Sequence, residues 1–335
     1  MIFIMKQSAT EPQIEAITAT LKKYGLGVHL SKGTEATIIG VIGDKSKLLA
    51  HVTPELLPGV ERCVPIAQSY KLASRTLHPE GKPALVGGFT IGGKELAIMA
   101  GPCAVESEEQ IFETAKAVNA SGAQFLRGGA YKPRTSPYAF QGMEDEGFKL
   151  LRAAADAHGL RVVSEVIAET QLDTAAQYCD MFQIGARNMQ NFRLLKAVGR
   201  SGVPVLLKRG IASTIDEWLD AAEYILAEGN ENVILCERGI RTFETATRNT
   251  LDIGAVAVAR ERSSLPIIID PSHAAGKVAY VEPLALAGVA AGANGVIVEV
   301  HPNPKEAMSD AAQQLTFAQF DVLVKKMEKV HSALA

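Results

Sequence analysis

The chain has 335 residues, a formal net charge of −3 and 47% hydrophobic residues. At about 100–200 residues per domain, this length predicts one large domain, or a large domain with a small one. The composition excludes a disordered, collagenous or coiled-coil protein. The acidic balance argues against a general nucleic-acid or anionic-membrane surface. No apolar run approaches the ~18 residues that a transmembrane helix needs.

The first 66 residues predict a small α+β domain. Residues Ile14, Ile17 and Leu21 recur at helical spacing, and Gly25 follows as a helix stop. The elements expected in chain order are a strand (1–6), a helix (11–24), two strands (27–31 and 36–42), a short helix (44–51) and a last strand (59–66). This βαββαβ order is typical of a ferredoxin-like domain.

The next segment, residues 67–94, contains no long periodic stretch. It holds Pro79, Pro83 and the Gly-rich run GGFTIGG. We expect a linker with one hairpin. The run from Gly88 to Lys94 is not a phosphate-binding P-loop, because no Ser or Thr follows the lysine and a strand is expected next.

From residue 95 to 335, eight short apolar runs alternate with segments that can form helices. The runs are ELAIMAGPC, AQFLRGG, RVVSEV, MFQIGAR, PVLLKRG, NVILCERG, PIIIDPSH and NGVIVEV. Nearly continuous apolar strands indicate a parallel sheet covered on both faces. Eight βα units predict a (β/α)₈ TIM barrel, so the fold class is α/β with a small α+β domain in front. An open doubly wound sheet is less favoured, because no GxGxxG follows the first strand.

Charged or reactive side chains end nearly every run, and in a closed barrel these ends meet at one mouth. Six of them are cations: Arg127, Lys132, Arg134, Arg187, Lys208 and Arg238. Two like charges 4 Å apart repel by ~1 kcal/mol in water. Such a cluster therefore predicts a pocket for a ligand with several negative charges, such as phosphate and carboxylate groups. Ion pairs of Arg238 with Glu237 and of Lys208 with Glu165 are the alternative interpretation.

A second set combines a thiol, an imidazole and two carboxylates. Its members are Cys103, His273, Glu299 and Asp310, at or just beyond the ends of strands one, seven and eight. This mixture of donors suits one divalent first-row metal ion: Mn, Fe, Co, Zn or Cu. His301 lies two residues beyond Glu299 and is a competing ligand.

The four cysteines never occur at CxxC spacing; they are Cys63, Cys103, Cys179 and Cys236. The opening MIFIMK has five residues before its lysine, which is too short for the apolar core of a signal peptide. We therefore expect free thiols in a cytoplasmic protein.

These residues lie in motifs that resemble 3-deoxy-D-arabino-heptulosonate 7-phosphate (DAHP) synthases of the short-chain type with an N-terminal ferredoxin-like regulatory domain. The motifs are AGPCAVES (100–107), LRGGAYKPRTSPYAFQG (126–142), QIGARNMQN (183–191), LLKRG (206–210), ERGIRTFETATRNTLD (237–252), DPSHAAG (270–276) and VIVEVHPNP (296–304). The resemblance covers essentially the whole chain. It implies the aldol-like condensation of phosphoenolpyruvate with erythrose 4-phosphate, the first step of the shikimate pathway, in a homotetramer.

The resemblance also implies roles for individual residues. The metal ligands would be Cys103, His273, Glu299 and Asp310. Phosphoenolpyruvate would contact Arg127, Lys132, Arg187, Lys208 and Arg238. Erythrose 4-phosphate would contact Arg134, Thr135 and Ser136.

Two further side chains are candidates for proton transfer. Lys132 is the candidate acid for the developing alkoxide, and Glu165 the candidate for handling the water. A plain phosphate contact explains Lys132 equally well. A Schiff base on Lys208 is ranked low, because the metal set makes it redundant.

Two other functions remain open at this stage. The sister enzyme, 3-deoxy-D-manno-octulosonate 8-phosphate synthase, uses arabinose 5-phosphate, and its counterpart of the KPRTS run typically has Asn where Pro133 stands here. A non-catalytic sugar-phosphate sensor would need the anion pocket but not the metal set.

The N-terminal domain brings none of the strand-end chemistry. By the two-residue period of a strand, His29 and Ser31 face away from the apolar pair Val28 and Leu30. They are candidates for binding an aromatic amino acid effector, tyrosine or phenylalanine. The alternative is a module for folding or dimerisation.

Overall fold

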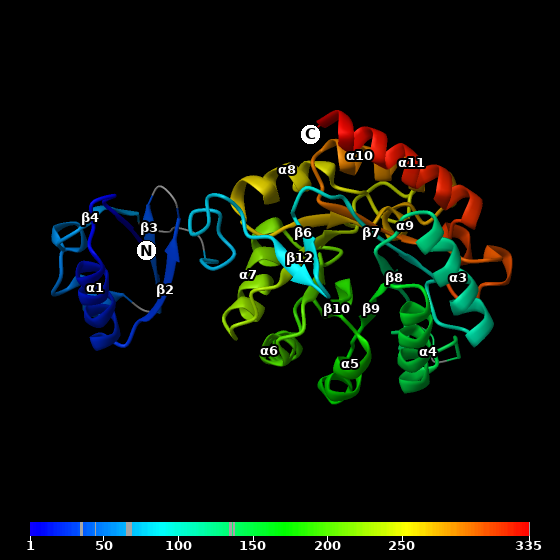
Figure 1. The fold of residues 1–335 in the computed structure, drawn as a ribbon, viewed down its shortest axis with the longest axis horizontal. Helices are drawn as coiled ribbons and strands as arrows, with labels where there is room; N and C mark the ends of the chain where they lie inside the picture. Colours follow the sequence, from blue (N-terminus) through cyan, green and yellow to red (C-terminus); the bar gives the residue numbers. More distant parts are fainter. Residues whose placement is uncertain (34–35, 44, 65–68, 134–135, 137, 335) are drawn as a thin grey trace. The chain divides into compact units, whose positions relative to one another are not determined.

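The computed structural model describes residues 1–33, 36–43, 45–64, 69–133, 136 and 138–334 (Figure 1). The chain divides into two compact units. The first comprises residues 1–81 with 262–264, and the second comprises 82–261 with 265–335. Within the described residues, no helix is both long enough and apolar enough to cross a membrane.

The first unit is a four-stranded antiparallel sheet with the order β2-β3-β1-β4. Its elements are β1 (Ile2–Met5), α1 (Glu11–Lys23), β2 (Gly27–Lys32), β3 (Thr37–Ile42), α2 (Ser46–Leu49), the 3₁₀ turn η1 (Pro54–Leu56) and β4 (Val60–Val64). The order confirms the predicted ferredoxin-like domain. The second helix is shorter than expected.

Helix α1 packs its apolar face on this sheet. Thr10 precedes the helix, and its backbone N–H donates to Gln13 Oε1 at 2.9 Å. The buried side chains of α1 join those of the first and third strands in one core: Ile14, Ile17, Leu21, Phe3, Met5, Ile39 and Val41. The helical spacing in the sequence therefore identified the buried face correctly.

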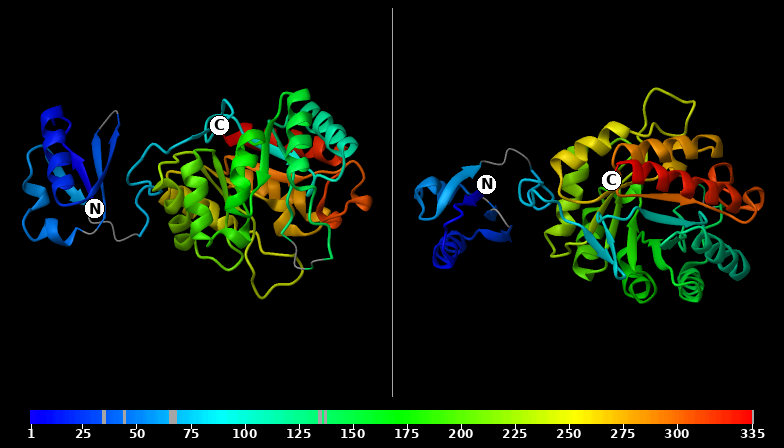
Figure 2. Two further views of the ribbon diagram at one scale, coloured as in Figure 1. Left: turned by 90° about the horizontal axis from the view of Figure 1, so that it is seen from below. Right: turned by 45° about the horizontal axis from the view of Figure 1, so that its top comes forward.

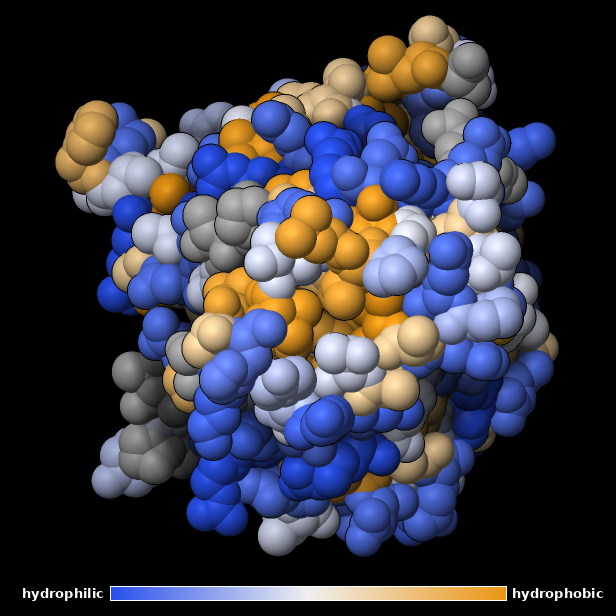
Figure 3. All heavy atoms as spheres, turned by 90° about the vertical axis from the view of Figure 1, so that its left-hand side faces the viewer, coloured by the Kyte–Doolittle hydropathy of each residue, from blue (hydrophilic) through white to orange (hydrophobic). Residues whose placement is uncertain are grey.

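Part of the unit's surface stays apolar. Figure 3, which looks from the left of Figure 1, shows an apolar patch surrounded by polar side chains. The large apolar side chains that this unit exposes are Leu30, Leu49 and Leu56. Helix α2 has only four residues. Patches of this kind are typical of surfaces that contact another molecule.

The second unit is the predicted barrel. Eight parallel strands close in the order β10-β11-β12-β13-β14-β7-β8-β9. The strands are β7 (Ala97–Gly101), β8 (Phe125–Arg127), β9 (Arg161–Glu165), β10 (Met181–Ile184), β11 (Val205–Lys208), β12 (Val233–Glu237), β13 (Ile267–Ile269) and β14 (Gly295–Glu299). Their nearly complete burial explains why they read as continuous apolar runs.

Helices surround the strands in every view (Figures 1 and 2). They are α3 (Glu108–Ala120), α4 (Glu144–Ala157), α5 (Leu172–Tyr178), α6 (Phe192–Ser201), α7 (Ile215–Leu226), α8 (Ile253–Arg262), α9 (Pro271–Ala275), α10 (Val278–Ala290) and α11 (Phe317–Leu334). Short 3₁₀ turns lie in the connections: η2 (Glu169–Gln171), η3 (Ala186–Asn188), η4 (Pro304–Glu306) and η5 (Ala311–Gln313).

A hairpin closes one end of the barrel. Strands β5 (Ala84–Val86) and β6 (Phe89–Ile91) pair antiparallel and share a core with barrel strands. The Phe89 ring packs edge-on against Phe125 with centroids 5.4 Å apart. Phe125 is the first residue of β8, so the hairpin covers the amino-terminal strand ends. Residues 82–94, expected as linker and hairpin, lie in the barrel unit.

Removing the Phe89 ring tests this closure. Phe89→Ala deletes a buried aromatic side chain, so we expect the free energy of unfolding to fall by about 3–5 kcal/mol. Urea unfolding followed by fluorescence of the single tryptophan, the buried Trp218, measures this loss. Leu85→Ala is the control, because Leu85 lies in the same hairpin but is 55% exposed. Equal losses in the two variants would contradict the hairpin's role in the core.

Candidate active site

A cavity of about 420 Å³ opens at the carboxyl ends of the strands. Side chains from many connections line it, including seven cations: Arg127, Lys132, Arg187, Lys208, Arg238, Arg241 and Arg248. Ser136, Glu165, His273 and Asp310 also line it. The mouth predicted from the sequence is therefore one strongly basic cavity.

The fold places three of these cations directly at strand ends. Arg127 and Lys208 are the last residues of β8 and β11, and Arg238 follows the last residue of β12. Their side chains are buried, and so is Lys132 in the connection after β8. Arg187 lies in η3 and is exposed.

Carboxylates compensate only some of these cations. Arg127 Nη1 lies 2.8 Å from Glu299 Oε1, and Lys208 Nζ lies 2.5 Å from Asp270 Oδ2. The pairing of Lys208 with Glu165, one reading of the sequence, is thus replaced by a pair with Asp270. Among the described residues, Arg187 and Arg238 have no ion-pair partner. The cavity keeps a positive charge that an anionic ligand can balance.

Glu237, the other partner suggested by the sequence, pairs with Arg209 instead. Arg209 Nη1 lies 2.9 Å from Glu237 Oε2 and 3.0 Å from Asp252 Oδ2. Glu237 Oε1 also accepts from the Gly239 N–H. Burial raises the pKa of Glu237, and the Arg209 guanidinium lowers it only in part. The pair links the ends of β11 and β12 between the cavity cations Lys208 and Arg238.

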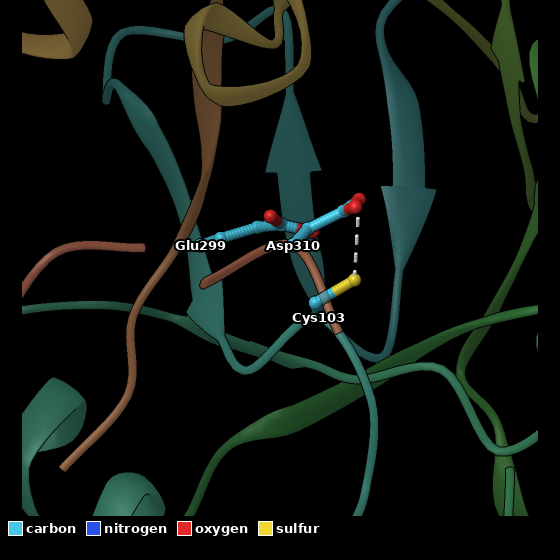
Figure 4. A group of neighbouring side chains, drawn as sticks. All are labelled: Cys103, Glu299 and Asp310. Atoms are coloured by element: carbon cyan, nitrogen blue, oxygen red, sulfur yellow. Dashed lines mark hydrogen bonds between the residues drawn. The ribbon is translucent and has the colours of Figure 1, made fainter. Parts of the chain in front are cut away.

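Three predicted metal ligands lie together beside the cavity. One ligand atom from each of Cys103, Glu299 and Asp310 lies within 4.8 Å of the others, and their side chains point toward one another (Figure 4). Cys103 Sγ is 3.6 Å from Asp310 Oδ2. Glu299 ends β14, and Cys103 lies two residues beyond the end of β7.

His273 completes this group from helix α9. Its Nε2 lies 3.4 Å from Glu299 Oε1 and 4.0 Å from Asp310 Oδ2. Its other nitrogen, Nδ1, lies 2.7 Å from Asp270 Oδ2. A carboxylate on the second nitrogen is the usual arrangement of a metal-binding histidine. The donor set therefore fits a divalent first-row ion.

The competing ligand His301 faces elsewhere. Its Nε2 lies 3.3 Å from Glu106 Oε2, and its Nδ1 accepts from the Asn303 N–H at 3.1 Å. Glu106 also accepts from the Met308 N–H. His301 thus helps to hold the connection after β14 rather than joining the thiol and the two carboxylates.

The group is strongly polarised. Burial would raise the pKa of Glu299, but His273, Arg127 and Lys132 lower it to about 2. Burial raises the pKa of the Cys103 thiol to about 12. A bound cation would oppose this effect and favour the thiolate.

The two candidates for proton transfer border the same cavity. Lys132 Nζ donates to the Cys103 carbonyl oxygen at 2.8 Å and lies 3.2 Å from its Sγ. Burial alone would lower the pKa of Lys132, but Cys103 and the carboxylate of Glu165 help to raise it above its usual value. Glu165 Oε2 accepts from Gln183 Nε2 at 3.3 Å.

Some site residues were not identified from the sequence. Arg241 and Arg248 lie 3 and 10 residues beyond Arg238. The cations identified from the sequence lie at or near the strand ends, whereas these two arginines lie too far along the connection. Asp270 lies in the seventh apolar run, PIIIDPSH, without an expected role, yet it contacts both Lys208 and His273. The candidate residues Arg134 and Thr135 lie outside the described part of the chain.

The first unit holds the candidate effector residues. Ser31 Oγ lies 3.2 Å from His78 Nδ1, and the rings of His29 and His78 meet edge-on with centroids 5.4 Å apart. His29 and Ser31 lie on one face of the sheet, as the two-residue period predicts. His78, from the segment after the sheet, is an additional member of this group.

The Arg209–Glu237 pair makes a testable contribution to stability. Arg209→Met leaves a buried carboxylate without its cation, so we expect a loss of about 3–5 kcal/mol in the free energy of unfolding. Adding Glu237→Leu should recover much of this loss. Asp252→Asn is the control, because this second partner is partly exposed and its loss should cost about 1 kcal/mol or less. Urea unfolding distinguishes these outcomes, and equal losses for Arg209→Met and Asp252→Asn would contradict the assignment.

Comparison with known proteins agrees with this geometry. Residues 74–335 match the DAHP synthetase I family, and residues 1–68 match the DAHP synthase ferredoxin-like domain. Phospho-2-dehydro-3-deoxyheptonate aldolase of Thermotoga maritima is 50% identical over 334 residues, which cover 100% of this chain and 98% of that protein. A 2-dehydro-3-deoxyphosphooctonate aldolase of Geobacter sp. is 30% identical over 73% of this chain and 96% of its own length.

Solved structures give the same result. The crystal structure of the DAHP synthase from Thermotoga maritima has a TM-score of 0.79 and 49% identity, and covers 99% of this chain and 97% of that one. A truncated form of the Thermotoga enzyme has a TM-score of 0.74 and 50% identity over 79% of this chain and 98% of its own. Family models match both the barrel and the ferredoxin-like domain, and the similarity to the Thermotoga enzyme extends over the whole chain. This chain therefore belongs to the DAHP synthase family.

Proposed function

We propose that this chain is a transferase that condenses phosphoenolpyruvate with erythrose 4-phosphate to give DAHP and inorganic phosphate. One observation carries the proposal: a cavity with more cations than carboxylates adjoins a thiol, imidazole and carboxylate group that suits a metal ion. Two anionic substrates repel each other, so the cations are needed to bring them together. Holding both in place can supply several kcal/mol of the barrier.

Five of the six cations identified in the sequence would bind phosphoenolpyruvate: Arg127, Lys132, Arg187, Lys208 and Arg238. Lys132, Arg187 and Arg238 have no ion pair with a carboxylate among the described residues, which leaves their charge available for this role. Ser136 lines the same cavity, and with Arg134 and Thr135 it would bind the phosphate of erythrose 4-phosphate.

The ligands of the metal ion would be Cys103, His273, Glu299 and Asp310. When bound, the ion would act as a Lewis acid on the aldehyde oxygen. The side chain of Asp270 would hold His273 through Nδ1, and Arg127 would hold one oxygen of Glu299. The identity of the ion is left open among Mn, Fe, Co, Zn and Cu.

The reaction joins C3 of phosphoenolpyruvate to C1 of the aldose. The raised pKa of Lys132 keeps its ammonium protonated, so it can donate a proton to the oxygen at C1. Glu165 would accept a proton from the water that adds to C2, and inorganic phosphate then leaves. Both side chains line the cavity where these atoms would meet.

The sister reaction with arabinose 5-phosphate is the second candidate, because a relative with that type of name is 30% identical to this chain. Pro133 in the KPRTS run and the match of residues 1–68 favour the four-carbon sugar. A non-catalytic sensor would not need the donor set around Cys103.

One assay separates these functions and tests the metal. We expect phosphate release with phosphoenolpyruvate and erythrose 4-phosphate, loss of activity with EDTA, and recovery on adding Mn²⁺ or another first-row ion.

His273→Ala should lower metal content strongly, and His301→Ala should lower it less, because His301 contacts Glu106 instead. Turnover with arabinose 5-phosphate alone would overturn the assigned substrate. Full activity in metal-free enzyme would remove the ion from the mechanism.

We also propose that the first unit binds tyrosine or phenylalanine as a feedback inhibitor. The hydroxyl of Ser31 and the ring of His29 lie on one face of the sheet beside His78, where a phenol could exchange hydrogen bonds with them. Tyrosine is therefore favoured over phenylalanine. The alternative role is dimerisation, and the assembly is proposed to be a homotetramer.

Substitutions in the full chain test this effector site. His29→Ala and Ser31→Ala should raise the tyrosine concentration needed for inhibition about tenfold or more, while leaving uninhibited turnover intact. Thr20→Ala is the matched control, because Thr20 lies on α1 and donates to the Ala16 carbonyl oxygen. If wild-type enzyme ignores both amino acids at millimolar concentrations, the dimerisation role is the better explanation.

A further inference from the structure

Two adjacent glutamines are buried next to the proposed metal ligands. Gln313 is 2% exposed and Gln314 is fully buried, just after Asp310 in the chain. A buried amide is costly unless its donors and acceptor are paired. The partners of the amide nitrogen and of the amide oxygen therefore show which neighbours each glutamine orients.

Gln313 connects a metal ligand with a cation of the cavity. Its Nε2 donates to Glu299 Oε2 at 2.7 Å, and its Oε1 accepts from Arg248 Nη1 at 3.1 Å. The other oxygen of Glu299 is held by Arg127 at 2.8 Å. The Glu299 carboxylate is thus fixed from both sides.

Arg248 continues this chain of contacts to a second ligand. The same Nη1 lies 3.3 Å from Asp310 Oδ2. The contacts therefore run from Glu299 through Gln313 and Arg248 to Asp310. Arg248 lies 62 positions before Asp310 and 65 positions before Gln313 in the sequence. Asp310 has a left-handed backbone with φ 48°, which is uncommon for a residue other than glycine. The partners of its side chain lie outside its own turn: Cys103, Arg248 and His273.

The backbone beside Arg248 reaches the helix that carries His273. The Arg248 N–H donates to the Ala275 carbonyl oxygen at 3.2 Å, and Asn249 Nδ2 donates to the His273 carbonyl oxygen at 3.0 Å. Gln314 reaches the remaining ligand, because its Oε1 accepts from the Cys103 N–H at 3.2 Å. Residues of two connections therefore contact all four proposed ligands.

We propose that Arg248 and Gln313 are positioning residues that orient Glu299 and Asp310 for the metal ion. The inference rests on the metal set proposed above and adds two residues that received no role in the sequence analysis. Orienting partners of this kind typically change metal affinity by about 10- to 100-fold when they are removed. Arg248 also lines the substrate cavity, so one residue contacts both parts of the site.

A simpler role for Arg248 is electrostatic attraction of substrate alone. Arg241 provides the comparison, because it lies in the same connection and lines the same cavity. Its backbone N–H donates to the Ile211 carbonyl oxygen, and among the described residues its side chain makes no hydrogen bond or ion pair with the four ligands. Losing either arginine removes one cavity cation, but only Arg248 contacts the ligands.

The test is metal affinity measured without substrate. Full-length wild type, Gln313→Leu, Arg248→Met and Arg241→Met are stripped of metal and titrated with Co²⁺ against a competing chelator. The absorption band of a Co²⁺–thiolate bond reports the involvement of Cys103. We expect Gln313→Leu and Arg248→Met to bind Co²⁺ about 10- to 100-fold more weakly than wild type, and Arg241→Met to bind it normally.

A double variant and two contrary results complete the test of the positioning role. The double variant Gln313→Leu/Arg248→Met should bind like the weaker single variant, because both changes break one chain of contacts. Arg248 is partly exposed, so its variant tests the idea even if Gln313→Leu folds poorly. Wild-type affinity in Arg248→Met would overturn the positioning role. A wild-type protein without a thiolate band would overturn the metal set itself.

Discussion

Burial of charge at the mouth of the barrel is the constraint on which the rest of the site depends. Closing eight strands brings their carboxyl ends together, and several of these ends are ionised side chains. A buried ion is costly unless a partner of opposite charge lies close to it. The pairs Arg127–Glu299, Lys208–Asp270 and Arg209–Glu237 satisfy this requirement. Further cations line the cavity, where an anionic ligand can supply the missing charge.

This arrangement requires a rigid support, because a misplacement of about 1 Å at a catalytic site can lower the rate about 100-fold. The opposite end of the barrel provides part of it. The β5–β6 hairpin fills the amino-terminal end with apolar side chains, among them Phe89 against Phe125. The ionised side chains thus lie at the carboxyl ends of the strands. The apolar packing of the hairpin lies at the opposite end of the barrel.

The fold was largely predictable from the sequence, because periodicity and strand count depend on local patterns. The rule that strand ends share one mouth also found Arg127, Lys208 and Glu299. Contacts between distant residues were not predictable in this way. Several carboxylates at the mouth could pair with Lys208. Only the packing of the barrel brings Asp270, 62 positions away in the sequence, next to it. Gln313 carries no charge and lies in the short 3₁₀ turn η5, so no pattern distinguished it.

Two carboxylates link the cations of the cavity with the proposed metal ligands. Glu299 contacts Arg127 on one side and faces Cys103 and Asp310 on the other. Asp270 contacts both Lys208 and His273. Each carboxylate therefore divides its charge between a cation that would meet substrate and a group that would meet the metal ion. An anionic substrate beside Arg127 or Lys208 would offset part of their positive charge. It would thereby favour a cation at the proposed metal ligands by electrostatics.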